Sequence, residues 1–279
     1  MKTFSEYKSP SKDLSIKESA TQMYTLFPKN KEELKRIIKD EMQKQGKEAD
    51  LNHIDVSKIT DLSNLFRGSD FNGDISKWDV SKTKDMNGMF FYAREFNCDI
   101  SGWDVSNVAD MHDMFHEAYE FNHDLSGWDV SNVKNMGGMF AWSKFNGDIS
   151  TWDVRNVTNM AGMFANSAFN GNLKRWNTKN VENMGFMFYY DNLFNQDISR
   201  WNVSNVESME RMFHGCKSFN QDISEWDVSN VTNMSEMFDG AKSFNQDISG
   251  WDVSNVTYIS DMFDDCPCPK EYQPMFFIE

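Results

Sequence analysis

Tryptophan recurs along this chain at a nearly constant interval, and that interval limits the fold more than any other feature. Successive tryptophans are 25, 25, 24, 24, 25, 25 and 25 residues apart. The series comprises Trp78, Trp103, Trp128, Trp152, Trp176, Trp201, Trp226 and Trp251. Ile54 stands 24 residues before Trp78 and begins a ninth unit. A period of roughly 20 to 50 residues is typical of proteins built from stacked repeats.

The one-residue differences in spacing all arise in one segment of the unit. Between the Met-Phe pair and the next phenylalanine lie five residues in most units, as in 116–120, but four in 67–70, 141–144 and 165–168. A segment that tolerates deletion is expected to be a surface loop. The other positions must stay in register, because a shift would move the apolar side chains away from the core.

A single unit is too small to fold alone. Burial of one large apolar side chain contributes roughly 1.5 to 3 kcal/mol, whereas ordering each residue costs on the order of 1.5 kcal/mol. The unit that begins at Trp226 has eight regularly placed apolar residues in 25. Stacked units bury the same positions against each other, so their stability is a sum of neighbour interactions. The sequence therefore predicts a tandem-repeat solenoid of nine coils over residues 51–265.

Two elements are predicted within each coil. Phe-Asn-x-Asp-Ile-Ser alternates as a short strand does, and the coils would pair as parallel strands about 4.8 Å apart. Met-x-x-Met-Phe, with its methionines three residues apart, indicates one helical turn. Strict alternation would point the asparagine outward. Alternatively, the asparagine satisfies backbone groups of neighbouring coils as a ladder.

Segments with different patterns flank the repeats. Asn30 and Glu33 resemble a helix-capping box, and an apolar stripe follows them up to Gly46. We predict a capping helix within 28–50, its stripe lying over the first coil, after an irregular or mobile segment 1–27. Residues 266–279 are predicted to form a C-terminal cap with Met275-Phe276-Phe277-Ile278 as its apolar plug.

Composition narrows the classes of partner and the compartment. The formal net charge is −15, with 43 acidic against 28 basic side chains, which disfavours nucleic acid and anionic membranes. No secretory signal, lipid anchor or spanning segment is visible, so the residues alone indicate a cytoplasmic protein without membrane insertion. Four cysteines are too few for a disulfide framework and are expected to be unpaired thiols.

The unit Phe-Asn-(Gly/Gln)-Asp-Ile-Ser-x-Trp-Asp-Val-Ser-Asn-Val-x-x-Met-x-x-Met-Phe resembles the BspA-type leucine-rich-repeat family of bacterial surface proteins, which includes repeats of mycoplasma lipoproteins. The resemblance covers residues 51 to 265. It implies a right-handed, leucine-rich-repeat-like solenoid, a place at the cell surface, and a role in adhesion or host interaction.

The repeated carboxylates are a candidate site for cations. One column of aspartates includes Asp74 and Asp99, and a second includes Asp79 and Asp104. Each carboxylate is predicted to accept backbone N–H groups at a turn; the alternative is that cations bridge the columns. Three histidines, His112, His116 and His123, fall at different repeat offsets, so no metal site is predicted from them.

No nucleophile elbow, phosphate loop or HExxH motif occurs, so no catalytic residue or cofactor is predicted and the chain is expected not to be an enzyme. The irregular side chains of the loop after Met-Phe should lie along one edge of the stack. Aromatic residues and arginine are favoured at protein interfaces. The candidate partner-binding edge is Phe91, Tyr92, Arg94, Tyr119, Trp142, Tyr189 and Tyr190. Local packing of these loop side chains is the alternative.

The predicted function is a non-enzymatic scaffold that recognises a protein or a glycan. The alternative is a structural element that self-associates or forms an arm of a larger complex.

Overall fold

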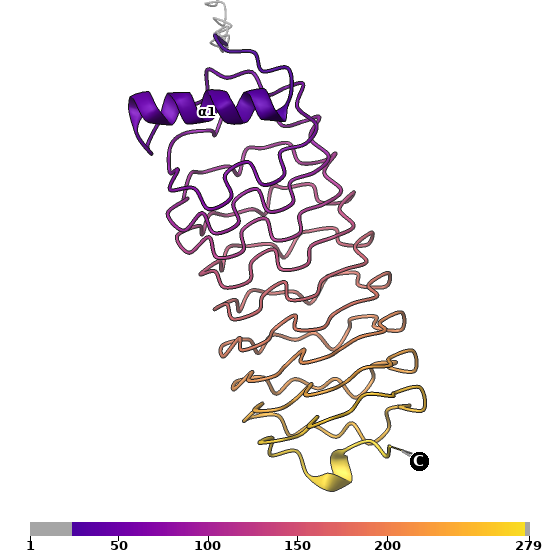
Figure 1. The fold of residues 1–279 in the computed structure, drawn as a ribbon. Coiled ribbons are helices and arrows are strands. Elements are labelled where there is room, and N and C mark those ends of the chain that lie inside the picture. The colour runs from indigo at the N-terminus through magenta and orange to yellow at the C-terminus, as the bar shows by residue number, and fades with distance from the viewer. Residues whose placement is uncertain (1–23, 277–279) are drawn as a thin grey trace, which may run out of the picture.

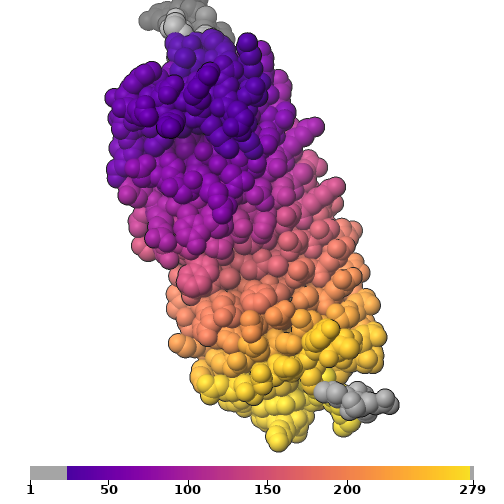
Figure 2. All heavy atoms as spheres, viewed as in Figure 1, coloured from indigo at the N-terminus to yellow at the C-terminus, as the bar shows by residue number. Residues whose placement is uncertain are grey.

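In the computed structural model, which describes residues 24–276, the chain forms a stack of coils with one α-helix at its N-terminal end (Figure 1). The helix α1 spans Lys31–Gln45, and a 3-10 turn, η1, spans Lys270–Tyr272 near the other end. The coils follow one another along a single axis as ridges of an elongated body (Figure 2). Within residues 24–276, no helix is both long enough and apolar enough to cross a membrane.

The bounds of α1 follow from its capping residues. Asn30 Oδ1 accepts the N–H of Glu33 at 2.9 Å, and the carboxylate of Glu33 accepts the N–H of Lys29 at 2.9 Å. Gly46 ends the helix with a φ of 85°, a conformation that glycine adopts without steric cost. Leu34 and Ile38 are buried against the first coil, so the apolar stripe covers the open end of the stack.

Neighbouring coils are joined in register by parallel bridges. In each coil the bridged residue lies directly before the first methionine, or before the residue that replaces this methionine. Eight successive bridges connect Asp61, Asp85, Asp110, Asn135, Asn159, Asn183, Ser208, Asn233 and Tyr258. These bridges are isolated, and the described residues contain no extended strand. The right-handed, leucine-rich-repeat-like character of the stack stays a prediction.

The positions predicted for the two elements of a coil are wrong. The ladder between coils runs through Met-x-x-Met-Phe, where the N–H groups of Met86, Gly88 and Phe90 donate to the next coil at 2.8–2.9 Å. No helical turn forms there, because the residue before the second methionine is left-handed, as at Gly88 with φ 56°. Phe-Asn-x-Asp-Ile-Ser is instead irregular in most coils, and a turn begins at its serine.

The asparagine after Phe forms the ladder that the sequence left as an alternative, at every step between coils except that from Asn97 to Asn122. Asn72 Oδ1 accepts the N–H of Asn97 at 2.8 Å, and Asn195 Oδ1 accepts the N–H of Asn220 at 2.9 Å. These side chains lie at the surface and point along the stack. Each Oδ1 atom therefore accepts an N–H group of the next coil in place of a backbone carbonyl.

The core is a set of stacked side-chain columns. Adjacent tryptophans lie nearly parallel, with ring centroids 6.4 Å apart at Trp78 and Trp103. Each indole N–H donates to a carbonyl of the preceding coil, as Trp152 does to Leu125 at 2.9 Å. This bond explains the choice of tryptophan, because its buried donor is satisfied. Phenylalanines and methionines fill the rest of the interior.

The two ends of the chain differ from the sequence-based predictions. Leu26, assigned to the irregular segment 1–27, pairs with Ile54 and accepts the N–H of Asp55 at 2.8 Å, so the stack begins before α1. At the other end Met275 is 72% exposed and does not act as a plug, whereas Phe276 packs partly against the core. Residues 1–23, Phe277 and Ile278 lie outside the described residues.

Candidate functional site

The loop after each Met-Phe pair holds the candidate edge, and its second residue is left-handed in every coil. Gly68, Gly215 and Gly240 occupy this position in three coils. Tyr92, Trp142 and Tyr190 occupy it in three others, with φ of 59°, 55° and 54°. A left-handed backbone is sterically unfavourable for a bulky residue. The next coil holds it in place, since the N–H of Trp142 donates to the carbonyl of Ala165 at 2.7 Å.

These three aromatic side chains are exposed although the chain has a large aromatic core. Tyr92 is 41% exposed, Trp142 is 42% exposed and Tyr190 is 41% exposed. Their repeat position is the same, so they face outward from one edge of the stack. The structure therefore presents large rings to solvent from a backbone pinned by hydrogen bonds between coils.

The second and third coils bring the first four predicted residues together. Arg94 lies 5.4 Å from the ring centroid of Tyr92 and 5.8 Å from that of Tyr119, and it pairs with Glu117 at 2.6 Å. A hydrogen bond to the Glu117 carboxylate raises the pKa of the Tyr92 phenol. The cluster therefore consists of two tyrosine rings beside the Arg94 guanidinium, whose positive charge is balanced by the Glu117 carboxylate.

Phe91 belongs to this cluster but is not a free surface side chain. It is half-buried, with the guanidinium of Arg67 at 3.8 Å from its ring centroid on one side. On the other side its ring stacks on His116 at 4.7 Å. Phe91 therefore supports the edge by packing, as the alternative interpretation of these loops expected.

The sixth coil carries the second aromatic cluster. Tyr189 is half-buried, and its ring centroid lies 4.6 Å from that of Tyr190 and 5.0 Å from that of His214. Burial raises the pKa of the Tyr189 phenol. Tyr190 also packs over Gly215, where a Cβ would meet its ring at 2.5 Å. Gly215 in the seventh coil therefore leaves space for the Tyr190 ring of the sixth coil.

The predicted edge thus consists of two clusters with Trp142 between them. Trp142 forms no ring contact among the described residues, and the loop of the following coil, Ala165-Asn166-Ser167-Ala168, contains no aromatic residue. Glu117 and His214, which contact the aromatic residues of the two clusters, are not among the predicted edge residues. Their signal was present, because both follow a Met-Phe pair in loops that neighbouring coils fill with aromatic residues.

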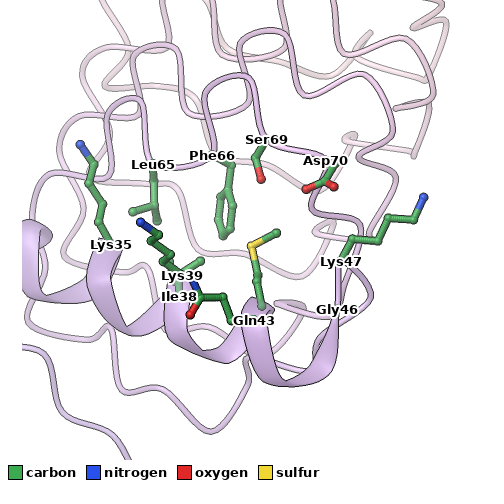
Figure 3. A pocket seen from close by; sticks show the side chains of 11 residues that line it. Lys35, Ile38, Lys39, Gln43, Gly46, Lys47, Leu65, Phe66, Ser69 and Asp70 are labelled. Atoms are coloured by element: carbon green, nitrogen blue, oxygen red, sulfur yellow. The ribbon is translucent and has the colours of Figure 1, made fainter.

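A groove between α1 and the first coil was not predicted. It encloses about 550 Å³, and its apolar floor includes Ile38, Met42, Leu65 and Phe66 (Figure 3). Lys35, Lys39 and Lys47 line its rim. The lining of the groove comes from α1 and the residues directly after it on one side and from residues 65–70 of the first coil on the other.

The aspartate columns accept backbone hydrogen bonds, as the turn hypothesis predicts. Asp99 Oδ1 accepts the N–H of Ser101 at 3.0 Å, and Asp104 Oδ1 accepts that of Ser106 at 3.1 Å. The same bond, to the N–H two residues on, recurs through both columns. The Ser101 N–H lowers the pKa of the Asp99 carboxyl.

Acid is expected to weaken the stack through these columns. A carboxyl whose folded pKa lies below its unfolded value stabilises the fold above the unfolded pKa, and this stability is lost as pH falls through the folded pKa. Asp197 defines the window, since its Lys174 partner lowers its pKa to about 2. We expect the thermal midpoint to fall between pH 4 and 2. A midpoint that rises over this range would show that repulsion within the columns dominates instead.

The matched variant for this prediction is Asp148→Asn. Asn172 already occupies the same column in the next coil and accepts the N–H of Lys174 at 3.0 Å. The amide should preserve the turn at neutral pH and reduce the loss of stability in acid.

A comparison with family models places the whole repeat region in one family. The model described as "Mycoplasma protein of unknown function, DUF285" matches residues 21–144, 124–213 and 191–271. Three overlapping matches show that the chain is a tandem repeat. No curated protein matches it.

Proposed function

The chain belongs to this Mycoplasma family, whose function is unknown, and we propose that it is a non-enzymatic scaffold that binds a protein or glycan partner along its aromatic edge. The edge comprises Tyr92, Arg94, Tyr119, Trp142 and Tyr190, with Phe91 and Tyr189 packed beneath it. The resemblance of its repeats to BspA-type leucine-rich repeats supports an adhesin-like role at a cell surface.

One observation carries the proposal: exposed aromatic rings occupy a left-handed position that glycine fills in three other coils and Glu117, Asn166 and Asp265 fill in the remaining three. Such a conformation costs on the order of 1 kcal/mol or more for a residue other than glycine. Folding alone would favour glycine at Tyr92, Trp142 and Tyr190, as at Gly68 and Gly240. Recognition of a partner supplies a reason for the rings, because tyrosine, tryptophan and arginine dominate binding at interfaces.

The arrangement suits a flat or extended partner. The three rings stand in the second, fourth and sixth coils, so they contact a surface at intervals along the stack. Hydrogen bonds from coil to coil fix their backbone, as between the N–H of Tyr190 and the carbonyl of His214 at 2.8 Å. A rigid edge loses little conformational entropy when it binds.

Glycine substitution tests the edge without damaging the fold. The triple variant Tyr92→Gly, Trp142→Gly and Tyr190→Gly is expected to lose partner binding while its thermal midpoint stays the same or rises, because glycine relieves the left-handed strain. The measurement is retention of ligands from a glycan array and from native-cell lysate and surface fractions by the immobilised chain. Tyr258→Ala is the control, since Tyr258 is 63% exposed but lies in the bridge column away from the edge.

A ligand kept by the wild type and by Tyr258→Ala but not by the triple variant supports the proposal. Equal retention by all three chains, or unfolding of the triple variant, contradicts it.

A second candidate function is assembly of the chain with itself. In the ninth coil the N–H groups of Ile259, Asp261 and Phe263 form no hydrogen bond within residues 24–276, whereas their equivalents Met234, Glu236 and Phe238 donate to the next coil. Such open donors can pair with another chain. Light scattering after size exclusion separates the two functions, because self-assembly needs no added partner.

A further inference from the structure

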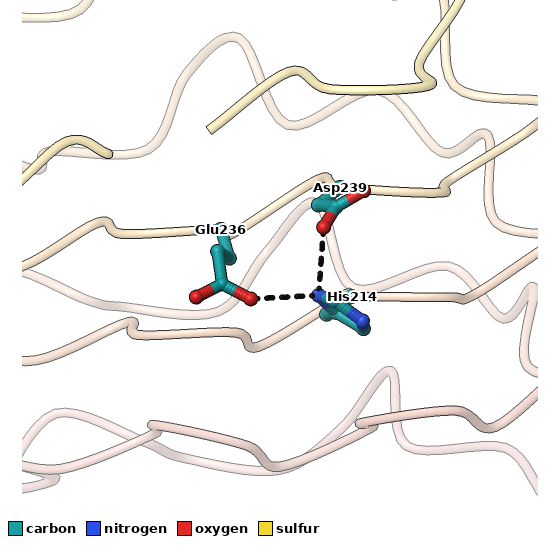
Figure 4. A group of neighbouring side chains, drawn as sticks. All are labelled: His214, Glu236 and Asp239. Atoms are coloured by element: carbon teal, nitrogen blue, oxygen red, sulfur yellow. Dashed lines mark ion pairs between the residues drawn. The ribbon is translucent and has the colours of Figure 1, made fainter. Parts of the chain in front are cut away.

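His214 faces two carboxylates that come from the coil next to its own. It follows Phe213 in the seventh coil, and Glu236 and Asp239 flank Met237-Phe238 in the eighth (Figure 4). The carbonyl of Glu236 accepts the N–H of Asp239 at 3.2 Å, so one turn brings both carboxylates to the same face. The N–H of Gly215 donates to the carbonyl of Asp239 at 2.7 Å and holds the two coils in register.

The spacing of the three groups fits a metal better than it fits hydrogen bonds. His214 Nδ1 lies 3.4 Å from Glu236 Oε2 and 3.4 Å from Asp239 Oδ2. Hydrogen bonds between nitrogen and oxygen are about 2.7 to 3.2 Å long. Ligands of a tetrahedral zinc ion at about 2.1 Å are about 3.4 Å from each other. One ligand atom from each residue lies within 4.8 Å of the others.

A buried nitrogen atom without a hydrogen-bond partner gives an independent reason to place a bound ion here. The Nδ1 atom of His214 is buried and makes no hydrogen bond within the described residues. The side chain as a whole is 12% exposed, against 22% for Glu236 and 26% for Asp239. A buried polar atom without a partner is unfavourable, and coordination of a cation would satisfy it.

A neighbouring residue also holds one of the two carboxylates in place. Arg211 Nε donates to Glu236 Oε2 at 2.8 Å, and its Nη2 contacts the other oxygen. Arg211 thereby fixes the orientation of the carboxylate, as residues behind metal ligands commonly do.

We propose that His214, Glu236 and Asp239 form a binding site for one divalent transition-metal ion of the zinc class, with the remaining coordination position open to solvent. Imidazole with carboxylate suits zinc, whereas magnesium and calcium prefer ligand sets made only of oxygen. The site does not depend on recognition at the aromatic edge.

The chain contains its own negative control in the third coil. His116 holds the same repeat position as His214, but the residues facing it in the fourth coil are Gly138 and Ala141 instead of two carboxylates. His116 Nδ1 pairs with Asp113 Oδ1 at 3.0 Å. A histidine in this column therefore lacks the full ligand set unless the next coil supplies it.

The test compares zinc binding to His214→Ala and His116→Ala with that to the wild type. All three are stripped with chelator and titrated with Zn²⁺ by calorimetry, and metal content is measured after dialysis. We expect the wild type and His116→Ala each to bind one zinc ion more than His214→Ala does. Loss of a residue that only orients a metal ligand lowers metal affinity by roughly 10–100-fold. Because His214 is itself a ligand, we expect His214→Ala to lose more zinc affinity at this site than that.

The four cysteines are common to the three chains, so zinc held by thiols cancels in the comparison. Zinc should raise the thermal midpoint of the wild type and of His116→Ala and leave that of His214→Ala unchanged. If His214→Ala does not fold, Asp239→Asn replaces it, because the amide keeps the shape and weakens the ligand. Equal zinc binding by the wild type and the folded ligand variant, or none in the wild type, overturns the proposal.

Discussion

Replacing Asp191 with alanine is expected to make the protein more stable above pH 7 and to remove most of the pH dependence of its stability between pH 4 and 7. Asp191 is fully buried in the loop of the sixth coil. Burial raises the pKa of its carboxyl to about 7, although Ser167 donates to it at 2.9 Å. On its other side lies Cys216, a buried thiol whose pKa is also raised by burial.

The sign follows from proton binding in the two states. Because the folded pKa is the higher one, the folded chain keeps the proton between pH 4 and 7 while the unfolded chain releases it. The stability that Asp191 contributes is therefore complete below pH 4 and is lost as pH rises to about 7. A shift of this size corresponds to about 4 kcal/mol. Alanine should abolish this slope, since it does not titrate.

The repeat itself suggests the variant and its control. Ala93, Ala118 and Ala241 occupy the same buried position in other five-residue loops, so alanine fits the loop. Asp191→Asn keeps the shape of the carboxyl without its charge and should also flatten the slope. The measurement is the free energy of unfolding from denaturant titrations at pH 4, 5, 6, 7 and 8.5. Parallel curves for the wild type and both variants would contradict a raised pKa at Asp191.

Phe140→Ala is expected to lower the free energy of unfolding by about 3 to 5 kcal/mol. The Phe140 ring is fully buried in the middle of the stack, 5.7 Å from Phe115, 3.9 Å from Phe145 and 5.9 Å from Phe164 between centroids. Removal leaves a cavity between coils that are fixed in register by backbone hydrogen bonds, so neighbouring side chains cannot close it. Denaturant unfolding followed by tryptophan fluorescence measures the effect.

The control is the same substitution at the end of the stack. Phe263 occupies the equivalent position in the ninth coil, is only partly buried, and stacks on Phe238 at 5.7 Å. Phe263→Ala should cost clearly less than Phe140→Ala. Equal losses would show that contacts between coils do not determine stability, contrary to the behaviour expected of stacked repeats.

The candidate site was predictable in position but not in function. The loop positions of Tyr92, Trp142 and Tyr190 follow from counting residues after each Met-Phe pair. Their left-handed backbone was signalled by the glycines of other coils, yet only the structure shows that the rings stay exposed. Half-burial of Phe91 depends on Arg67 and His116, which come from the coils on either side.

The sequence alone determined which residues stack. A period of 24 or 25 residues places Trp on Trp and Phe on Phe, because a large apolar side chain displaced by one position would leave the core. It also marked the ends of α1, since Asn30, Glu33 and Gly46 act through bonds within a few residues. Such features depend on local chemistry or on repetition, and both are visible in the sequence.

Only the tertiary structure decided where the coils bond and what meets across them. The strand-like ladder lies at Met-x-x-Met-Phe instead of Phe-Asn-x-Asp-Ile-Ser, because left-handed residues prevent a helix there and turn alternate N–H groups toward the next coil. The meeting of His214 with Glu236 and Asp239 depends on the rotation of side chains from separate coils. Periodicity fixes the column in which a residue lies, whereas the backbone angles fix the direction in which it points.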